Sequence, residues 1–362
     1  MSQTRRAILL AAVLHALALS IPAIKSGNLS GGIRFGCLTG GPCYAEANRS
    51  ILPEHAPVYR SGGYDGQFYY YIANRIFLGT EISLDSEVFR WARIAYPVLC
   101  GAAVLYSPNA LVWSLAIIPL FAHLCAIWSL RSYPRAGWVF ALNPFSILSA
   151  SLFLADGLAL SLVVMGLVRI LDSQSDKRRV AIGWVLVAIA CLTKETMLAF
   201  SIAYILVNLR NVRSFFAIAS MLPLFLWWWY IGFSPLAAAE RGIASGFLSY
   251  IAQPDTMLSG RSLLFPYILL IAILAWVSGP GPDRKTGILL LLAGTVPPLL
   301  ASTEYWDNFA NIARLFIPVT VGAIICSFWS NRWSWILSAY SLVFCFLILV
   351  REWRAIPDVI IY

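Results

Sequence analysis

Charged residues are scarce in this chain of 362 residues. Asp, Glu, Lys and Arg together make up 12% of the sequence, whereas hydrophobic residues make up 60% and the mean hydropathy is +0.76. An ordinary soluble domain is about 25% charged and about 45–50% apolar. Because a globular core of this size cannot hide so much apolar surface, the composition excludes an ordinary soluble protein and predicts a polytopic membrane protein.

Several enzyme motifs are also missing. The sequence has no Walker A loop, no paired His-x-x-x-His site and no Gly-x-Ser-x-Gly elbow, so the usual signatures of nucleotide-dependent enzymes, zinc enzymes and serine hydrolases are absent. Its three histidines, at positions 15, 55 and 123, are scattered, and we expect no transition-metal site. Any chemistry must therefore come from carboxylates and cations.

Long apolar segments follow one another along most of the chain. Since about 20 apolar residues cross the hydrocarbon of a bilayer, we expect an all-α fold with about ten to twelve membrane passes in one integral membrane domain, residues 1–362. The first segment lacks a clear cleavage site and is expected to remain as the first helix. The candidate segments are 6–25, 92–107, 109–129, 136–154, 157–171, 180–194, 196–209, 214–232, 263–279, 286–301, 313–329 and 333–350.

Basic residues collect in short linkers between these segments, and the net charge is +9. Short loops rich in Lys and Arg stay in the cytoplasm. We therefore expect a multi-pass protein of a bacterial inner membrane with a cytoplasmic N-terminus, a first periplasmic loop at 26–90, and further outer loops at 233–262 and 302–312. The cations flank membrane segments, which indicates contact with anionic membrane lipids rather than with nucleic acid.

One basic linker does not fit this alternation. The stretch "RSYPR", residues 131–135, is typical of a cytoplasmic loop, yet two full crossings between 91 and 130 would place it outside. Either 91–107 is only partly inserted, or the following segment is broken at Asn143-Pro144. The sequence leaves both explanations open.

The first outer loop contains two cysteines in "GCLTGGPCY". Cys37 and Cys43 flank a Gly-Pro turn in a compartment where thiols can oxidise. Whether they form a disulfide depends on geometry that the sequence does not give.

The most unusual stretch of that loop is "YRSGGYDGQFYYYIANRIF", residues 59–77. Phe68, Tyr69, Ile72 and Ile76 have helical spacing, which predicts an amphipathic interfacial helix near 66–78 with aromatic rings at head-group depth. Asp65 would begin this helix, either as an N-cap or as a base that takes a proton from an acceptor hydroxyl. The glycines around it would let another molecule approach the backbone closely.

An acidic residue in the first outer loop followed by such a helix resembles the GT-C glycosyltransferases, multi-pass enzymes that use polyprenyl-phosphate sugars. Further stretches resemble this class in a compatible order, and mannosyltransferases and uncharacterised bacterial members in particular. Where family patterns often have Tyr-Thr-Glu, this chain has Leu154-Ala155-Asp156, and Lys194 replaces a more usual Arg. The similar stretches are "FRWARIAYPVL" (89–99), "ALNPFSILSASLFLADGLALSLVVMGL" (141–167), "CLTKETMLAF" (191–200) and "ARLFIPV" (313–319).

The resemblance implies roles for particular residues. Asp65 would be the catalytic base, and Asp156 would be a second catalytic residue. Asp156 also stands between two apolar runs, where a charge is costly unless it is paired or hydrated. Arg314, Lys194 and Glu195 would bind the donor, with Arg314 on its phosphate. Further substrate contacts would come from Arg60, Tyr64, Gln67 and Tyr69 of the first loop.

The implied donor is a polyprenyl-phosphate-linked sugar, and the acceptor is a glycan, a lipid or a protein. We expect no cofactor for such a donor. The sequence leaves open whether Asp65 and Asp156 hold a divalent cation. Two other classes also remain open. The protein could be a lipid or sugar transporter or flippase, although no duplicated halves are evident, or it could be a non-catalytic subunit of a cell-envelope polysaccharide assembly complex.

Overall fold

The computed structural model describes residues 2–37, 41–60, 63–172, 176–209, 213–234, 264–277, 284–300, 309–328, 332–355 and 359–360. Within those ranges the protein is 82% helical, with almost no strands. The predicted all-α class is therefore confirmed. The predicted outer loops at 233–262 and 302–312 lie mostly outside the described residues.

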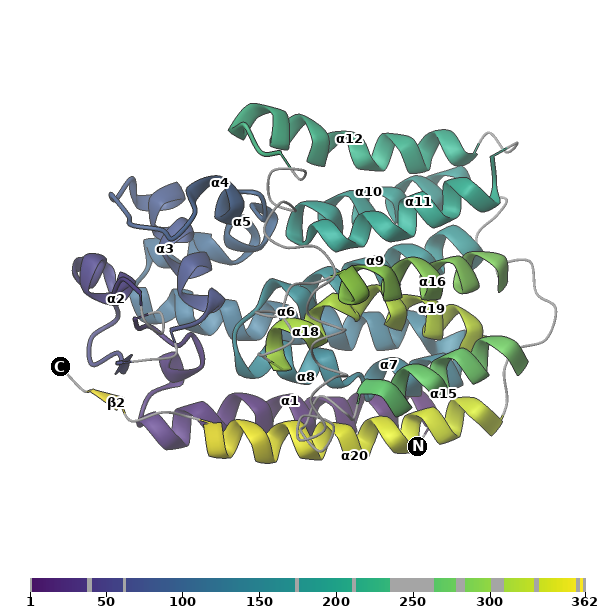
Figure 1. Cartoon of the computed structure of the whole chain (residues 1–362), viewed down its shortest axis with the longest axis horizontal. Coiled ribbons are helices and arrows are strands. Elements are labelled where there is room, and N and C mark those ends of the chain that lie inside the picture. The colour runs from purple at the N-terminus through teal and green to yellow at the C-terminus, as the bar shows by residue number, and fades with distance from the viewer. Residues whose placement is uncertain are drawn as a thin grey trace.

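The helices form a bundle with a smaller group of short elements at one end (Figure 1). The short elements lie at the end opposite the N-terminus, and the strand β2 (Val359–Ile360) pairs there with β1 (Val58–Tyr59) in antiparallel register. The other short elements are α2 (Tyr44–Ala47), α3 (Asp65–Leu78), α4 (Glu87–Trp91) and α5 (Ala95–Gly101). The bundle consists of α1 (Gln3–Ser26), α6 (Pro108–Ser129), α7 (Pro134–Ala141), α8 (Pro144–Ser151), α9 (Ala155–Asp172), α10 (Lys177–Thr193), α11 (Leu198–Val207), α12 (Arg213–Ile231), α15 (Leu264–Val277), α16 (Arg284–Leu300), α18 (Phe309–Leu315), α19 (Ile317–Ser327) and α20 (Arg332–Ala355).

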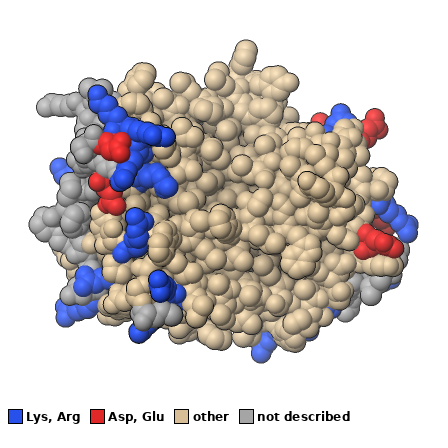
Figure 2. Space-filling model, turned by 180° about the vertical axis from the view of Figure 1, so that it is seen from behind, with Lys and Arg blue, Asp and Glu red and all other residues tan. Residues whose placement is uncertain are grey.

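The surface of the bundle is that of a membrane-embedded protein. Charged side chains gather towards the two ends of the face in Figure 2, and the broad area between them is almost free of charge. Large apolar side chains face outwards, such as Trp229 and Trp276, each 82% exposed. A soluble monomer rarely exposes so much contiguous apolar surface.

Four described helices are long and apolar enough to cross a membrane, or five if the α18–α19 pair, bent by 47°, is one span. The single-helix spans are Gln3–Ser26, Pro108–Ser132, Ser214–Ile231 and Arg332–Arg354. Several other predicted segments are helices of fewer than 18 residues, such as α11 and α15. A total of ten to twelve passes thus remains a prediction.

The structure bears on both explanations for residues 131–135. Ala95–Leu105 is a short apolar helix of about 16 Å, too short to cross the hydrocarbon. The next predicted segment is also broken, because the Asn143 side chain caps a new helix, α8. Tyr133 donates a hydrogen bond to Asp172 and stacks on Phe328 at 4.1 Å. The linker 131–135 therefore lies beside the last residue of α9 and beside Phe328, which follows α19, and the side of the membrane on which it lies stays a prediction.

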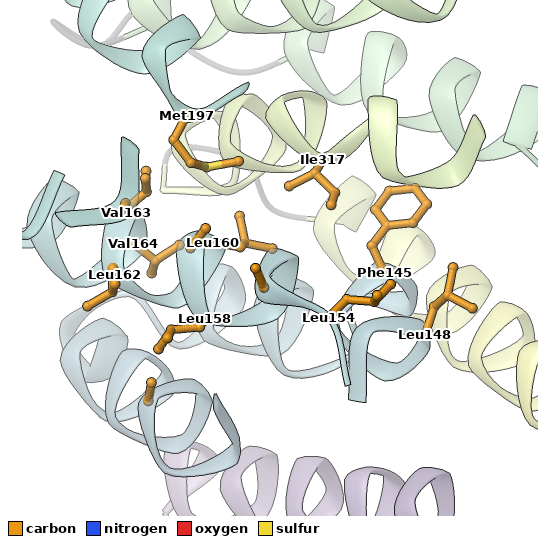
Figure 3. Packing of buried hydrophobic residues seen from close by; sticks show 14 of the residues in the cluster. Phe145, Leu148, Leu154, Leu158, Leu160, Leu162, Val163, Val164, Met197 and Ile317 are labelled. Carbon is orange, nitrogen blue, oxygen red and sulfur yellow. The ribbon is translucent and has the colours of Figure 1, made fainter. Parts of the chain in front are cut away.

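Close packing of α9 against α10 fixes one wall of the bundle. A Cβ placed on Gly166 would lie 2.6 Å from the carbonyl oxygen of Gly183, so the two backbones touch. Apolar side chains of α8, α9 and neighbouring helices, including Phe145, Leu158 and Met197, fill the space beside them (Figure 3). This packing sets the position of the N-terminus of α9, where Asp156 lies.

The helix α3 is present where the sequence predicts it, but its aromatic side chains are buried in protein, and its position at the membrane interface stays a prediction. Residues 66–74 are all buried, and exposure begins only at Arg75. The aromatic rings pack inside the protein: Tyr70 against Phe35, and Tyr69 against Tyr96, both edge to face. The periodicity therefore reflects contacts within the first loop and with α5 rather than contact with lipid head groups.

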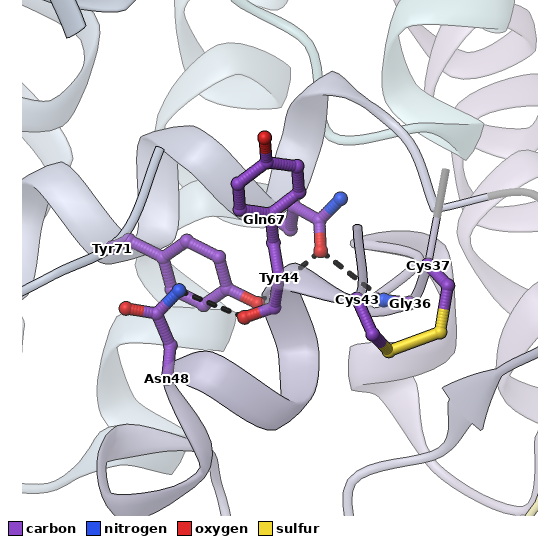
Figure 4. Close-up of a disulfide and its surroundings, with 7 residues drawn as sticks. All are labelled: Gly36, Cys37, Cys43, Tyr44, Asn48, Gln67 and Tyr71. Carbon is purple, nitrogen blue, oxygen red and sulfur yellow. Dashed lines mark hydrogen bonds between the residues drawn. A yellow bond between two sulfur atoms is a disulfide. The ribbon is translucent and has the colours of Figure 1, made fainter. Parts of the chain in front are cut away.

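A disulfide joins Cys37 to Cys43 beneath this helix (Figure 4). The side-chain oxygen of Gln67 accepts hydrogen bonds from the Gly36 amide at 3.1 Å and from the Tyr71 hydroxyl at 3.2 Å. Gln67 therefore ties α3 to the disulfide-bonded turn.

Candidate functional site

The carboxylate of Asp65 is held by arginines from two other parts of the chain. Its Oδ1 accepts a hydrogen bond from Arg90 Nη1 at 2.7 Å, and its Oδ2 accepts one from Arg314 Nη1. Arg93 Nη1 lies 3.8 Å from Oδ2. Asp65 is not the N-cap of α3, because Tyr64 takes that position. Its carboxylate is thus used for ion pairing rather than for capping.

The glycines next to Asp65 serve packing within the chain. A Cβ on Gly63 would lie 2.7 Å from the carbonyl oxygen of Gly36, and one on Gly66 would lie 2.8 Å from that of Leu152. The expectation that these glycines leave room for another molecule is therefore wrong. They bring the start of α3 against the end of α8, close to Asp156.

Asp156 is the most deeply buried acid of the site, with its side chain 1% exposed. Its Oδ2 accepts a hydrogen bond from Arg314 Nε at 2.9 Å, and its Oδ1 lies 3.4 Å from Lys194 Nζ. Arg314 therefore bridges Asp156 and Asp65. Both carboxylates would be costly to bury without such a partner.

Glu195 is the third of the predicted site carboxylates. It accepts two hydrogen bonds from Arg93, at 3.0 Å from Nε and 2.8 Å from Nη2, and it lies 3.8 Å from Lys194 Nζ. Arg93 also reaches the Tyr69 hydroxyl at 3.5 Å. The segment between α10 and α11 is thereby tied through Arg93 to Tyr69 of α3.

Arg90, Arg93 and Asp85 were missed as site residues in the sequence. Asp85 accepts two hydrogen bonds from Arg90, at 2.7 and 2.6 Å, and the Arg90 guanidinium lies 4.1 Å from the centre of the Phe68 ring. The available signal was the spacing of the two arginines, because residues three apart share one face of a helix. In the sequence, Arg90 and Arg93 resemble ordinary membrane-flanking cations, and their place in the site was therefore not predicted.

Together these residues form what we call the ionic cluster: Asp65, Asp85, Arg90, Arg93, Asp156, Lys194, Glu195 and Arg314. Four carboxylates face four cations, so the formal net charge of the cluster is zero. Its members lie up to 249 residues apart in the chain. They meet at the end of the bundle that carries the short elements α2 to α5 (Figure 1).

Two buried polar atoms of the cluster have no hydrogen-bond partner among the described residues: Nη2 of Arg314 and Oδ1 of Asp156. Lys194 is 4% exposed, and its ammonium lies 3.4 and 3.8 Å from its nearest carboxylate oxygens. Unpaired buried donors are costly. Arg314 Nη2 is therefore a buried donor of the cluster that has no partner among the described residues.

The other predicted substrate contacts differ in position. Tyr64 lies beside the cluster and donates a hydrogen bond to Asn311 at 2.7 Å. Tyr69 contacts Arg93. Gln67 instead has the packing role described above, and Arg60 is exposed after β1, with no ion pair to the cluster among the described residues. The structure thus joins Asp65, Asp156, Lys194, Glu195 and Arg314, as the sequence predicts, but not Arg60 or Gln67.

The electrostatics of Asp65 follow from its neighbours. Burial alone would raise the pKa of this carboxyl, but Arg90, Arg314 and Arg93 outweigh it and hold the pKa well below its ordinary value of 3.8. Asp65 is thus ionised, and a carboxylate held this way is a weak base.

A divalent cation does not fit between Asp65 and Asp156 as they stand. Arg314 occupies the space between the two carboxylates. Among the residues that the structure places, no group of three or more His, Cys, Asp or Glu side chains could hold a metal ion. A cation at this point would have to displace an arginine.

Comparisons with known proteins give no relative. No family model matches the sequence, and no curated protein or solved structure matches it. The interpretation of the ionic cluster therefore depends on its chemistry and on the motifs quoted above.

Proposed function

We propose that this protein is an integral membrane glycosyltransferase of the GT-C type. It moves a sugar from a polyprenyl-phosphate donor to a hydroxyl of a glycan, lipid or protein acceptor at the outer face of a bacterial inner membrane. The observation that carries the proposal is the convergence of Asp65, Asp156, Lys194 and Arg314 in one buried cluster at the end of an apolar bundle.

A phosphate linked to a lipid suits this arrangement. Arg314 Nη2 is unpaired among the described residues, and the ammonium of Lys194 lies 3.4 and 3.8 Å from its nearest carboxylate oxygens, so both can donate to phosphate oxygens in charge-assisted hydrogen bonds. The cluster adjoins a bundle with wide apolar surfaces, against which a polyprenyl tail can lie. A water-soluble anion without a lipid tail would make no contact with these apolar surfaces.

The proposed reaction is a single displacement. The acceptor hydroxyl attacks the anomeric carbon, the bond from that carbon to the phosphate oxygen breaks, and its electron pair leaves on the polyprenyl phosphate. Asp65 takes the hydroxyl proton, and the configuration at the anomeric carbon inverts. Arg314 and Lys194 stabilise the charge that grows on the leaving phosphate, an effect often worth about 3 kcal/mol for one donor.

The distribution of basic linkers supports the orientation. The linker 131–135 lies beside Asp172 and Phe328, and thus near the basic linkers that follow them. The ionic cluster lies at the opposite end of the bundle. Basic linkers remain in the cytoplasm, and this supports an outer position for the cluster.

The test is a transfer assay with purified protein. A panel of polyprenyl-phosphate sugars is first screened for protection against thermal unfolding, and the protective donor is then used with candidate acceptors. Asp65→Asn should abolish transfer without weakening donor binding. Glu54→Gln is the matched control, because it removes one negative charge from the same loop at a side chain that is 85% exposed.

Transfer that survives Asp65→Asn would overturn the role of Asp65 as the base. Wild-type protein that binds a donor but transfers no sugar would overturn the proposed function and favour a transporter. Protection by none of the donors would also overturn the proposed function and would favour a structural subunit.

A further inference from the structure

The ligand-free cluster leaves Asp65 unable to act as a base. Both of its oxygens accept hydrogen bonds from arginines, one from Arg90 and one from Arg314. A general base works best when its pKa lies near the working pH, and that of Asp65 is held far lower. For Asp65 to take a proton, one of these arginines must leave it.

The two arginines are not equally free to leave. Arg90 is held by three further contacts: two hydrogen bonds to Asp85 and one contact with the face of Phe68. Arg314 is anchored through Nε to Asp156, while its Nη2 is unpaired. The terminal nitrogens of Arg314 can therefore change partner while Nε keeps its bond to Asp156.

We infer that the carboxylate of Asp65 occupies, in the ligand-free protein, part of the site of the donor phosphate, and that the phosphate displaces it from Arg314. This inference rests on the proposed function and adds to it the order of binding. A carboxylate and a phosphodiester present similar oxygens to the guanidinium fork. The two anions therefore compete for Arg314.

Displacement would turn Asp65 into a base without moving it far. Arg90 keeps hold of Oδ1, so the carboxylate stays in place, while Oδ2 becomes available to the acceptor hydroxyl. The loss of one cation and the arrival of a negative phosphate both raise the pKa of Asp65 from its depressed value. The donor must therefore bind before the acceptor can be deprotonated, and Arg90 is a positioning residue in this scheme.

The inference can be tested with a probe that does not react. A short polyprenyl methyl phosphodiester carries one negative charge and does not titrate near neutral pH. Its binding to the full-length protein in detergent is measured for the wild type, for Asp65→Asn and for Glu54→Gln. Asp65→Asn should bind the probe at least about tenfold more tightly, because its amide competes less for Arg314 than a charged hydrogen bond does. Glu54→Gln should bind like the wild type.

Two further arms complete the experiment. Dimethyl phosphate presents the same charged group without a lipid, so it separates a lipid-linked donor from a free phosphate. Calorimetry on the wild type in buffers of different ionisation enthalpy measures the proton uptake that should accompany binding and increase as the pH is lowered from 7 to 4, because loss of Arg314 raises the pKa of Asp65. This second measurement needs no variant and remains informative if Asp65→Asn does not fold.

The outcomes separate the two proposals. Equal or weaker probe binding by Asp65→Asn, or binding to the wild type without proton uptake, would overturn the displacement of Asp65 and leave the proposed function standing. No probe binding by any of the three proteins would overturn both. Dimethyl phosphate that binds as tightly as the lipid probe would overturn the lipid-linked donor of the proposed function.

Discussion

Replacing Arg314 with methionine should destabilise the fold through the two carboxylates that it bridges. Arg314 donates to Asp156 through Nε and to Asp65 through Nη1. Methionine keeps much of the apolar volume of the side chain but donates no hydrogen bond. After the change, Asp65 still has Arg90 at 2.7 Å, whereas the nearest cation to Asp156 is Lys194 at 3.4 Å.

The size of the effect follows from these contacts. A hydrogen bond to a charged group contributes about 1.5–3 kcal/mol, and Arg314 makes two of them. Removing one partner of a buried ion pair costs about 3–5 kcal/mol, because the other charge is left uncompensated. The two hydrogen bonds give about 3–6 kcal/mol and the uncompensated charge gives about 3–5 kcal/mol, so we expect Arg314→Met to lower the free energy of unfolding by about 3–5 kcal/mol.

The measurement is denaturant unfolding in mixed micelles, followed by the fluorescence of the 14 tryptophans. Adding Asp156→Asn to Arg314→Met should recover about 1–3 kcal/mol, since the uncompensated charge is then gone. Arg75→Met is the matched control, because this exposed arginine donates only to the carbonyls of Gly79 and Thr80. The reasoning is refuted if Arg314→Met unfolds like the control, or if Asp156→Asn makes the Arg314→Met protein less stable still.

Two further predictions concern packing and pH. Gly166→Ala should cost about 1–3 kcal/mol in unfolding free energy by forcing α9 away from the Gly183 carbonyl, whereas Gly137→Ala, whose Cβ would meet nothing closer than 3.8 Å, should cost nothing; equal losses in denaturant unfolding would contradict the close contact. Because the pKa of Asp65 is lower in the folded than in the unfolded protein, its contribution to stability is fully present above about pH 4 and is lost as the pH falls towards its folded pKa. The difference in unfolding free energy between the wild type and Asp65→Asn should therefore be constant from pH 8 to about pH 4 and shrink only below it, and a difference that instead grows as the pH falls below about 6 would show a raised pKa of Asp65.

Much of the architecture was predictable because it depends on local properties. The apolar runs gave an all-α membrane protein, and the helix over 66–78 was placed to within one residue of α3, Asp65–Leu78. Burial of that helix was not predictable, because a stripe of aromatics has the same periodicity whether it faces lipid or protein. Only its contacts with Phe35 and Tyr96 distinguish the two.

The site was predictable in its rare charges but not in its pairing. Asp156 stood out because an ionisable residue between apolar runs is costly and needs partners, and the family resemblance pointed to Asp65, Lys194, Glu195 and Arg314. The sequence suggested a partner only where the two charges are neighbours, as for Lys194 and Glu195. Arg90 and Arg93 did not stand out in this way, because cations are common beside membrane segments.

By itself, therefore, the sequence determined that this protein lies in a membrane, that it is helical, and that a short set of charged residues needs partners of opposite charge. Each of these follows from composition and from spacing along the chain. Only the tertiary structure decided which charges compensate one another. Arg314 reaches Asp65 across 249 residues, and such a contact depends on how α3, α9 and α18 pack rather than on any local preference. The same packing places three arginines around one carboxylate and so makes Asp65 a weak base in the ligand-free protein.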